Sequence, residues 1–351
     1  MNEDIYLKLR EHLDRLPGGF PATESGVELK LLKKLFTPEE AEIAVQLRLM
    51  PEPVSSIAER LGMDEAKAEE KLESMAGQGS IYRIRIGEHA LYMAYQFVIG
   101  VYEFHLNTID RELSELMEEY IPYIARVWES TKTLQLRVVP VGSAVDATPA
   151  VATYNRAREL LKNQELIAVA PCICRKEQGL MGNECERPHE TCLTFAHAAQ
   201  YYIDNGIGRR ISEDEALKLL ELAEESGLVI SPTNAREIIN ICLCCGCCCG
   251  VLRGLKLFER PADHVNSPYL ARIETELCSA CGTCLERCQI DAIEEGEEAM
   301  EVDPARCIGC GLCLPTCPEE AITLVEKPGT DAPPANIVEM LVRIALERGL
   351  A

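Results

Sequence analysis

Apolar residues recur every three or four positions in the first part of the chain, which predicts helices there. One helix face is formed by residues at this spacing: Ile5, Leu9, Leu13 and Leu16. The run Pro17-Gly-Gly19 ends this helix. A second helix is expected to begin at Thr37-Pro-Glu-Glu40, because the threonine and the second glutamate form a capping box and proline suits the first turn.

The pattern then changes from helical to alternating between residues 54 and 92. A helix over 54–61 is followed, after Gly62, by a helix from Asp64 to about Ala76. The alternation in 81–86 predicts a strand, and residues 89–92 are its expected hairpin partner. Three helices followed by a hairpin resemble a winged helix, spanning about residues 37–93 within an N-terminal domain of residues 1–93.

A winged helix invites a DNA-binding hypothesis, which the charges of this segment oppose. The helix that would enter the major groove carries five carboxylates and two lysines: Asp64, Glu65, Glu69, Glu70, Glu73, Lys67 and Lys71. Such a helix would meet phosphates with the wrong sign of charge. Only Arg83 and Arg85, on the hairpin, would help. We therefore expect this segment to contact protein or to be structural, and not to bind DNA.

The middle of the chain, residues 94–265, combines helical and strand patterns. A helical stretch is expected over 101–130, a strand over 134–139, a helix over 154–164 and an apolar strand over 166–170. A capping box at Ser212 opens a helix that Gly227 closes, and residues 227–230 suit a short strand. Strand, helix and strand at this spacing predict a small α/β unit.

Eight cysteines near the C-terminus form a repeated run. Cys278-x-x-Cys281-x-x-Cys284-x-x-x-Cys288 recurs 29 residues later as Cys307-x-x-Cys310-x-x-Cys313-x-x-x-Cys317. The flanks repeat too, since Asp291-Ala-Ile293 corresponds to Glu320-Ala-Ile322. A zinc ribbon would need only two CxxC pairs and would leave half of these cysteines unexplained. Two four-thiolate sites, as two [4Fe–4S] cubes require, account for all eight.

Over about residues 270–326 the chain resembles the bacterial two-cluster ferredoxins, in which the fourth cysteine of each run ligates the other cluster. The resemblance implies Cys278, Cys281, Cys284 and Cys317 on one cube, and Cys307, Cys310, Cys313 and Cys288 on the other. Gln289 departs from the family pattern, because the second run has Pro318 at the equivalent place. We expect Cys288 to remain a ligand, because the proline shapes the turn and donates nothing to iron.

Ten further cysteines lie in two groups in the middle of the chain. The first group contains Cys172, Cys174, Cys185 and Cys192, and the second contains Cys242, Cys244, Cys245, Cys247, Cys248 and Cys249. Packing does not explain six cysteines within eight positions. Soft thiolates favour a further iron–sulfur cluster or zinc, and metal-free redox thiols are the alternative.

The ligands of this additional centre stay open at this point. The second group offers three CxxC pairs: Cys242/Cys245, Cys244/Cys247 and Cys245/Cys248. The four cysteines of the first group could also complete a cube alone. Arg175 would place positive charge near cluster sulfurs or would form a surface salt bridge. His189 and His197 are candidate ligands by proximity, although such histidines are more often hydrogen-bonding residues.

Composition and charge narrow the class of protein. The chain has 351 residues, 47% of them hydrophobic, which predicts two or three globular domains. Eighteen cysteines without an export signal indicate the cytoplasm, where thiols serve as metal ligands. The longest nearly apolar run, 90–102, is shorter than the roughly 18–20 residues of a membrane span. It predicts a buried helix or a subunit interface, so a second copy of the chain is one candidate partner.

The net charge of −22 disfavours nucleic acid and suits docking on a basic redox partner. Residues 268–327 hold 13 acidic and 4 basic side chains. No dinucleotide or phosphate-loop motif is present, and no spacing of carboxylates singles out an acid–base pair.

We therefore expect an α+β multidomain protein. Its parts are a winged-helix-like domain (1–93), a helical linker with a small α/β cysteine-rich domain (94–265), a 2[4Fe–4S] ferredoxin domain (266–328), and a linker with a C-terminal helix (329–351). The expected function is an electron carrier or an electron-input subunit of a partner oxidoreductase, more than a stand-alone enzyme. The alternatives are a cluster-based redox or metal-sensing regulator, and a reductase that depends on thiols or a cluster at Cys242–Cys249.

Overall fold

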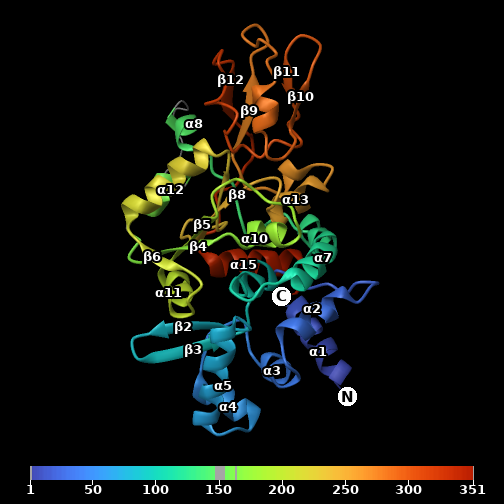
Figure 1. The fold of residues 1–351 in the computed structure, drawn as a ribbon, viewed down its shortest axis with the longest axis vertical. Helices are drawn as coiled ribbons and strands as arrows, with labels where there is room; N and C mark the ends of the chain where they lie inside the picture. The colour runs from blue at the N-terminus through green and yellow to red at the C-terminus, as the bar shows by residue number, and fades with distance from the viewer. Residues whose placement is uncertain (1, 147–154, 163, 351) are drawn as a thin grey trace.

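The computed structural model describes residues 2–146, 155–162 and 164–350, and three regions follow one another along the long axis of the molecule (Figure 1). Helices and a small sheet from the first third of the chain occupy one end. A five-stranded sheet with surrounding helices fills the middle. Loops and two short β-ladders from the C-terminal cysteine-rich region form the other end.

The N-terminal region is mainly helical. Its helices are α1 (Asn2–Asp14), α2 (Val27–Leu35), α3 (Pro38–Ala44), α4 (Val54–Leu61), α5 (Glu65–Gln78), α6 (Tyr102–Phe104) and α7 (Arg111–Glu129). Its strands are β1 (Glu52–Pro53), β2 (Tyr82–Ile86) and β3 (His89–Met93), paired in the order β1-β3-β2. The predicted hairpin and the capping box at Thr37 are confirmed. The winged-helix assignment itself stays a prediction.

Strand β2 of the hairpin packs on helix α11 (Ala196–Asp204) of the middle region, while the tip of the hairpin at residues 85–89 is exposed. Arg83 is buried and pairs with Glu73 and Asp204 at 2.7 and 3.4 Å. Arg85 pairs with the same two carboxylates at 3.0 and 3.2 Å. The two arginines that could have contacted phosphate are thus both paired with carboxylates of the chain itself.

The apolar run 90–102 is buried as expected, but the prediction of a helix there is wrong. It contains the end of β3, an extended turn and an irregular segment at Phe97–Val101, where Val98 and Ile99 have non-helical dihedral angles. The side chain of Gln96 accepts a hydrogen bond from the backbone N–H of Gly18, so the polar residue in this run fixes the turn. The run is covered by the chain's own core.

The middle region is built on a five-stranded sheet in the order β6-β4-β5-β8-β7, and all its pairings are antiparallel. The strands are β4 (Ile167–Pro171), β5 (Glu190–Phe195), β6 (Arg209–Ile211), β7 (Val229–Pro232) and β8 (Asn240–Cys244). The α/β unit expected over residues 134–170 does not form as predicted, because its first strand makes only isolated bridges and every pairing in the sheet is antiparallel. β4 is apolar on both faces and resembles a strand of a parallel sheet, but both of its neighbours run in the opposite direction.

Helices flank this sheet: α8 (Gly142–Asp146), α9 (Ala157–Leu161), α10 (Ile173–Leu180), α11, α12 (Glu213–Glu225) and α13 (Gly250–Lys256). The two elements that were expected before the sheet are only partly formed. The predicted strand 134–139 runs beside β7 but forms only isolated bridges, at Leu136 and Val139. The predicted helix 154–164 is shorter, over Ala157–Leu161; positions 154 and 163 of that prediction lie outside the described residues.

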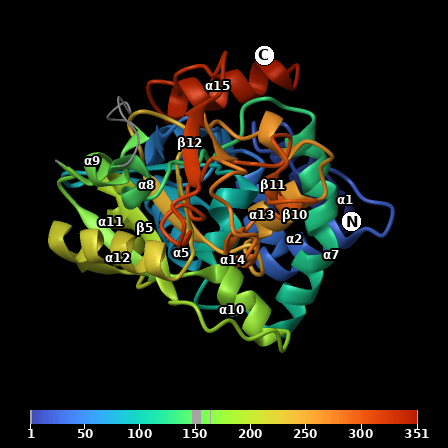
Figure 2. The same cartoon turned by 90° about the horizontal axis from the view of Figure 1, so that it is seen from above.

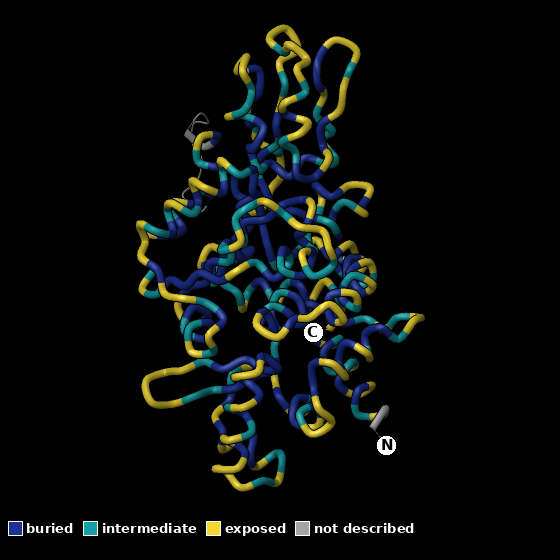
Figure 3. Tube along the Cα trace, in the orientation of Figure 1, coloured by how far each residue is buried: buried dark blue, intermediate teal, exposed yellow. Residues whose placement is uncertain are grey.

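The C-terminal cysteine-rich region contains α14 (Thr283–Arg287) and two antiparallel ladders. One ladder pairs β9 (Tyr269–Ile273) with β12 (Ile322–Glu326), and the other pairs β10 (Ile293–Glu295) with β11 (Met300–Val302). Cysteine loops connect these short strands, so most of this region is held by loop contacts and not by a sheet. In Figure 3 its outer loops are largely exposed, whereas its base is buried.

The chain ends in α15 (Ile337–Glu347), which returns to the N-terminal region. Arg348 donates hydrogen bonds to the backbone oxygens of Asp14 and Leu16 at 3.0 and 2.7 Å. Figure 2 shows α15 and α10 on opposite sides of the molecule. Buried apolar residues from Tyr6 to Leu324 form one continuous cluster, so the three regions share a core. Within the described residues, no helix is both long and apolar enough to cross a membrane.

Candidate metal centres

The repeated cysteine run gives a repeated structure. The backbone N–H of Ala292 donates to the Sγ of Cys288, and the N–H of Ala321 donates to the Sγ of Cys317, both at 3.3 Å. Asp291 and Glu320, one residue earlier in each copy, have positive φ angles of 55° and 50°. Amide donors of this kind stabilise negative charge on sulfur. The last cysteine of each run therefore accepts an equivalent backbone hydrogen bond, which suits a thiolate.

Several of the eight thiols of this region lie close enough to influence one another. The thiol of Cys288 raises the pKa of both Cys310 and Cys313 through charge repulsion, although burial is the larger cause for each. The pKa of Cys310 rises to about 12. Cys278 and Cys281 act in the same way on Cys284. The structure therefore brings Cys288 to the thiols of the second run.

Gln289, where the family has proline, makes a contact that proline could not make. Its side-chain Oε1 accepts a hydrogen bond from the backbone N–H of Gly246, 2.9 Å away, and its Nε2 donates to the carbonyl oxygen of Arg287 at 3.1 Å. The approach is close, since a Cβ on Gly246 would lie 2.2 Å from the backbone oxygen of Gln289. The loop of the middle cysteines is therefore seated directly against the residue that follows Cys288.

Two arginines bind the C-terminal end of α12 and tie the cysteine-rich loops together. Arg287 donates to the carbonyl oxygens of Glu224 and Glu225, the latter at 3.0 Å. Arg187 donates from Nε to the carbonyl oxygen of Ser226 at 3.2 Å. Cations suit a helix C-terminus because its last carbonyl groups lack partners and carry partial negative charge.

The ten middle cysteines separate into two groups that do not follow their order in the sequence. We call the first the four-thiol group: Cys185, Cys245, Cys247 and Cys248. We call the second the six-thiol group: Cys172, Cys174, Cys192, Cys242, Cys244 and Cys249. Each group draws thiols from both sequence groups.

The separation follows from the geometry of β8. Successive side chains of a strand point to opposite faces, so Cys242 and Cys244 share one face. The chain leaves the strand at Cys245, which joins the four-thiol group, and turns back at Cys249, the N-cap residue of α13. Neighbours in sequence are thereby sent to different centres.

The six-thiol group lies between strands β5 and β8 and the starts of two helices. Cys192 of β5 is the register partner of Cys242. Cys172 is the N-cap residue of α10, and Cys174 lies in its first turn. Neighbouring thiols interact in one continuous series: Cys172, Cys174, Cys249, Cys244, Cys242 and Cys192. These interactions, together with burial, hold the pKa of Cys172 and of Cys242 well above the usual value.

Arg175 lies between the two groups. Its side chain is 1% exposed and donates to the hydroxyl of Thr191 and, at 3.0 Å, to the carbonyl oxygen of Leu243. Because Arg175 is buried, the hypothesis of a surface salt bridge is wrong. The thiols of Cys172, Cys245 and Cys244 raise its pKa. A buried, permanently charged guanidinium is therefore shared by both groups.

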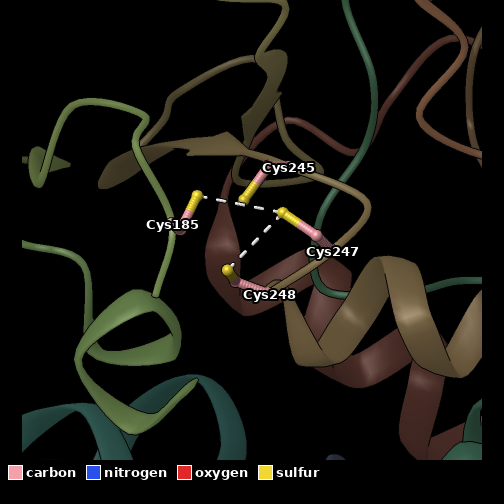
Figure 4. A group of neighbouring side chains, drawn as sticks. All are labelled: Cys185, Cys245, Cys247 and Cys248. Carbon is pink, nitrogen blue, oxygen red and sulfur yellow. Dashed lines mark hydrogen bonds between the residues drawn. The ribbon is translucent and has the colours of Figure 1, made fainter. Parts of the chain in front are cut away.

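The four-thiol group is compact (Figure 4). All four Sγ atoms lie within 4.8 Å of one another. The Sγ of Cys247 is 3.8 Å from that of Cys185 and 3.6 Å from that of Cys248. Arg187 donates from Nη1 to the Sγ of Cys247 at 3.3 Å. A hydrogen bond with Cys248 and the charge of Arg175, working against burial, lower the pKa of Cys245 to about 4.

The structure brings together the thiols of only some of the ligand sets that the sequence left open. Of the three CxxC pairs, only Cys245/Cys248 falls within one group. The set Cys172, Cys174, Cys185 and Cys192 is divided, because Cys185 lies with the four-thiol group.

Neither histidine candidate belongs to the four-thiol group within the described part of the chain. His189 contributes its backbone oxygen to the N–H of Cys172 at 2.7 Å. The ring of His197 lies 6.2 Å from that of Tyr82.

A pair of carboxyl groups, buried Glu177 and half-buried Glu118, adjoins the six-thiol group. Glu177, on α10, accepts a hydrogen bond from the hydroxyl of Tyr102, and Glu118 is held by both Nη atoms of Arg253. Burial, and then the neighbouring Glu118, raise the pKa of Glu177 to about 8. The neutral form of Glu177 can donate to Glu118, which satisfies both carboxyl groups.

No pattern in the sequence indicates directly that Arg187, Gly246 or Gln289 contacts these centres. The single usable signal was the break in the repeat at Gln289, where a residue able to accept a hydrogen bond replaces proline. Arg187 lies two positions after Cys185, but spacing alone could not show that its side chain reaches Cys247.

Comparison with known families agrees with the geometry at the C-terminal end. Residues 271–324 match the family described as the 4Fe-4S dicluster domain. This match supports a ferredoxin-like cluster domain and implies at least one iron–sulfur cluster. No curated protein and no solved structure matches the chain. The donor set fits: eight thiols gather in two runs, with amide N–H groups directed at the sulfurs of Cys288 and Cys317.

Proposed function

We propose that this protein is an iron–sulfur electron-transfer protein, acting as a carrier or as the electron-input subunit of a partner oxidoreductase. One cube would be held by Cys278, Cys281, Cys284 and Cys317, and the other by Cys307, Cys310, Cys313 and Cys288. The six-thiol group would hold a further iron–sulfur centre. Each cluster, when bound, exchanges one electron at a time.

The observation that carries this proposal is the orientation of the ferredoxin-like region. Cys281 is exposed, whereas the residue after Cys288 contacts the loop of the middle cysteines through Gly246. In the proposed pairing Cys281 and Cys288 belong to different cubes, so one cube would be open to a partner and the other would adjoin the loop of the middle cysteines. An arrangement of this kind suits transfer between a docked protein and an internal centre.

The surface around Cys281 supports docking of a basic partner. Twelve of the 13 carboxylates in residues 268–327 are exposed. Three of the 4 basic residues there donate to backbone oxygens of the chain itself: Arg287, Arg306 and Lys327. Leu277 and Leu285, 55% and 40% exposed, add apolar contact area beside the cysteine run. Complementary charge would steer the encounter, and salt would weaken the steering.

The regulator hypothesis is less well supported, because the arginines that would contact DNA already pair with Glu73 and Asp204. The reductase hypothesis would require an open position at the middle cysteines. Cys244, Cys245, Cys248 and Cys249 are buried, and Cys247, which is exposed, lies within the four-thiol group. We therefore favour the electron-transfer function over both the regulator and the reductase hypotheses.

The test is a stopped-flow measurement with the anaerobically prepared full-length protein. The reduced protein should reduce a basic acceptor such as cytochrome c, at a rate that falls as ionic strength rises. Replacing Glu276 and Glu286 together by lysine should lower the rate at low salt by roughly tenfold. Glu24→Lys is the matched control, since Glu24 is exposed but belongs to the N-terminal region.

Iron and acid-labile sulfide, measured on the same samples, separate two kinds of failure. The docking proposal would be contradicted if the protein contained both clusters but its rate of electron transfer changed neither with salt nor on replacement of Glu276 and Glu286. A protein without two cubes' worth of iron and sulfide would contradict the assignment of the eight cysteines.

A further inference from the structure

The spacing of the sulfurs distinguishes the four-thiol group from the ferredoxin cysteines. Around a single zinc-like ion with bonds of about 2.3 Å, tetrahedral geometry places neighbouring sulfurs about 3.8 Å apart. The two separations observed at Cys247, 3.8 and 3.6 Å, match this edge length. In a cube each thiolate binds a different iron, so the cluster holds the protein sulfurs much further apart.

We propose that Cys185, Cys245, Cys247 and Cys248 bind one tetrahedrally coordinated divalent metal ion, zinc or iron, and not a cube. All four Sγ atoms lie within 4.8 Å of one another, which leaves no room among them for four irons and four sulfides. This site is separate from both ferredoxin clusters and does not depend on the proposed electron transfer.

The charges around the group suit such an ion. Four thiolates around one divalent metal give the site a net charge of about −2. Arg187 donates to the Sγ of Cys247 at 3.3 Å, and buried Arg175 lies beside Cys245. Two fixed guanidinium groups therefore balance the charge that metal binding creates.

The ion would link two loops that are far apart in the sequence. Cys185 comes from the loop between α10 and β5, and the other three ligands come from the turn between β8 and α13. The second turn contains Gly246, which contacts Gln289 of the ferredoxin-like region. A metal here would stabilise the surface on which that region is seated.

Stoichiometry tests the proposal in the full-length protein purified without oxygen. Cys185→Ser and Cys247→Ser should each lower the metal content by one ion per chain and leave acid-labile sulfide unchanged. Cys281→Ser is the positive control, because loss of a cube removes iron and sulfide together. Zinc and iron are counted separately, so the same measurement identifies the ion.

X-ray absorption at the edge of the identified metal gives a second readout on the unmutated protein when that metal is zinc, and Mössbauer spectroscopy gives it for iron. The expected result is one metal with four sulfur neighbours, at about 2.3 Å for zinc. Loss of several irons with an equal number of sulfides in the Cys185 or Cys247 variants would overturn the proposal. Unchanged metal content, or disulfides among the four cysteines in the purified protein, would overturn it too.

Discussion

The backbone N–H of Gly246 donates a hydrogen bond to the side-chain Oε1 of Gln289 across 2.9 Å. Gly246 lies among the middle cysteines, and Gln289 directly follows Cys288 of the ferredoxin-like run. Both groups are buried at this contact. The hydrogen bond thus joins the two cysteine-rich parts of the molecule at a point where each carries a proposed metal ligand.

Gly246→Ala should destabilise the protein by about 1–3 kcal/mol, because the added Cβ would overlap the backbone oxygen of Gln289 and force the two loops apart. Thermal unfolding of the anaerobic holoprotein measures the effect. Gly77→Ala is the control, since a Cβ there meets no atom within 4 Å and Gly77 lies in α5. Equal stability of the two variants would show that the contact is not close in solution.

Gln289→Pro restores the residue found after Cys317 and should leave iron and sulfide unchanged, because proline is compatible with a ligand at Cys288. It should nevertheless cost about 1–3 kcal/mol, since the buried N–H of Gly246 loses its acceptor. Gln289→Glu keeps an acceptor and serves as the control for cluster content. A proline variant that lost half of its iron would indicate that the glutamine supports the ligand and not only the loop contact.

Arg83→Ala should destabilise the protein by about 1–3 kcal/mol, because it leaves Glu73 and Asp204 without a buried cation. Replacing more exposed Arg85 in the same way should cost less. Urea unfolding compares the two variants.

Neither the unmutated holoprotein nor its apo form should bind DNA specifically, because the hairpin arginines are engaged and α5 is acidic. Anisotropy titration at low salt against genomic fragments, including the promoter of the protein's own operon, measures this. Sequence-specific binding tighter than about micromolar that changes with cluster oxidation would make the regulator hypothesis the better one.

The buried carboxyl of Glu177 predicts a loss of stability as pH rises. Its pKa is about 8 in the folded protein against an ordinary value of 4.5, so folding favours the protonated form. The contribution of protonated Glu177 to the free energy of unfolding is fully present below about pH 4.5 and is lost as pH rises through 8. Glu177→Gln, which mimics the protonated form beside Tyr102 and Glu118, should remove this loss, on the order of 1–3 kcal/mol.

Unfolding midpoints between pH 5 and pH 9 measure this difference, with exposed Glu119→Gln as the control. If the Glu177 and Glu119 variants lose stability equally with rising pH, the raised pKa of Glu177 is not present in solution.

The sequence by itself determined the parts of this protein that depend on local spacing. The capping box at Thr37 and the hairpin turn at Gly87 each depend on residues a few positions apart, and both form as predicted. At Ser212 the side chain accepts a hydrogen bond from the N–H of Glu215, so the predicted helix start is confirmed there by its N-cap. The repeat at Cys278 and Cys307 likewise identified the ferredoxin-like region, because its ligands lie on short loops whose spacing is itself the signal.

Only the tertiary structure decided how the other ten cysteines are divided. Cys244 and Cys245 are adjacent in sequence, but the pleat of β8 and the turn after it send them to different groups. Cys185 reaches Cys247 across 62 positions, and Gln289 reaches Gly246 across 43, through the packing of whole elements. Such contacts depend on the direction in which strands enter the sheet, and the apolar pattern of β4 is the same for a parallel and an antiparallel neighbour.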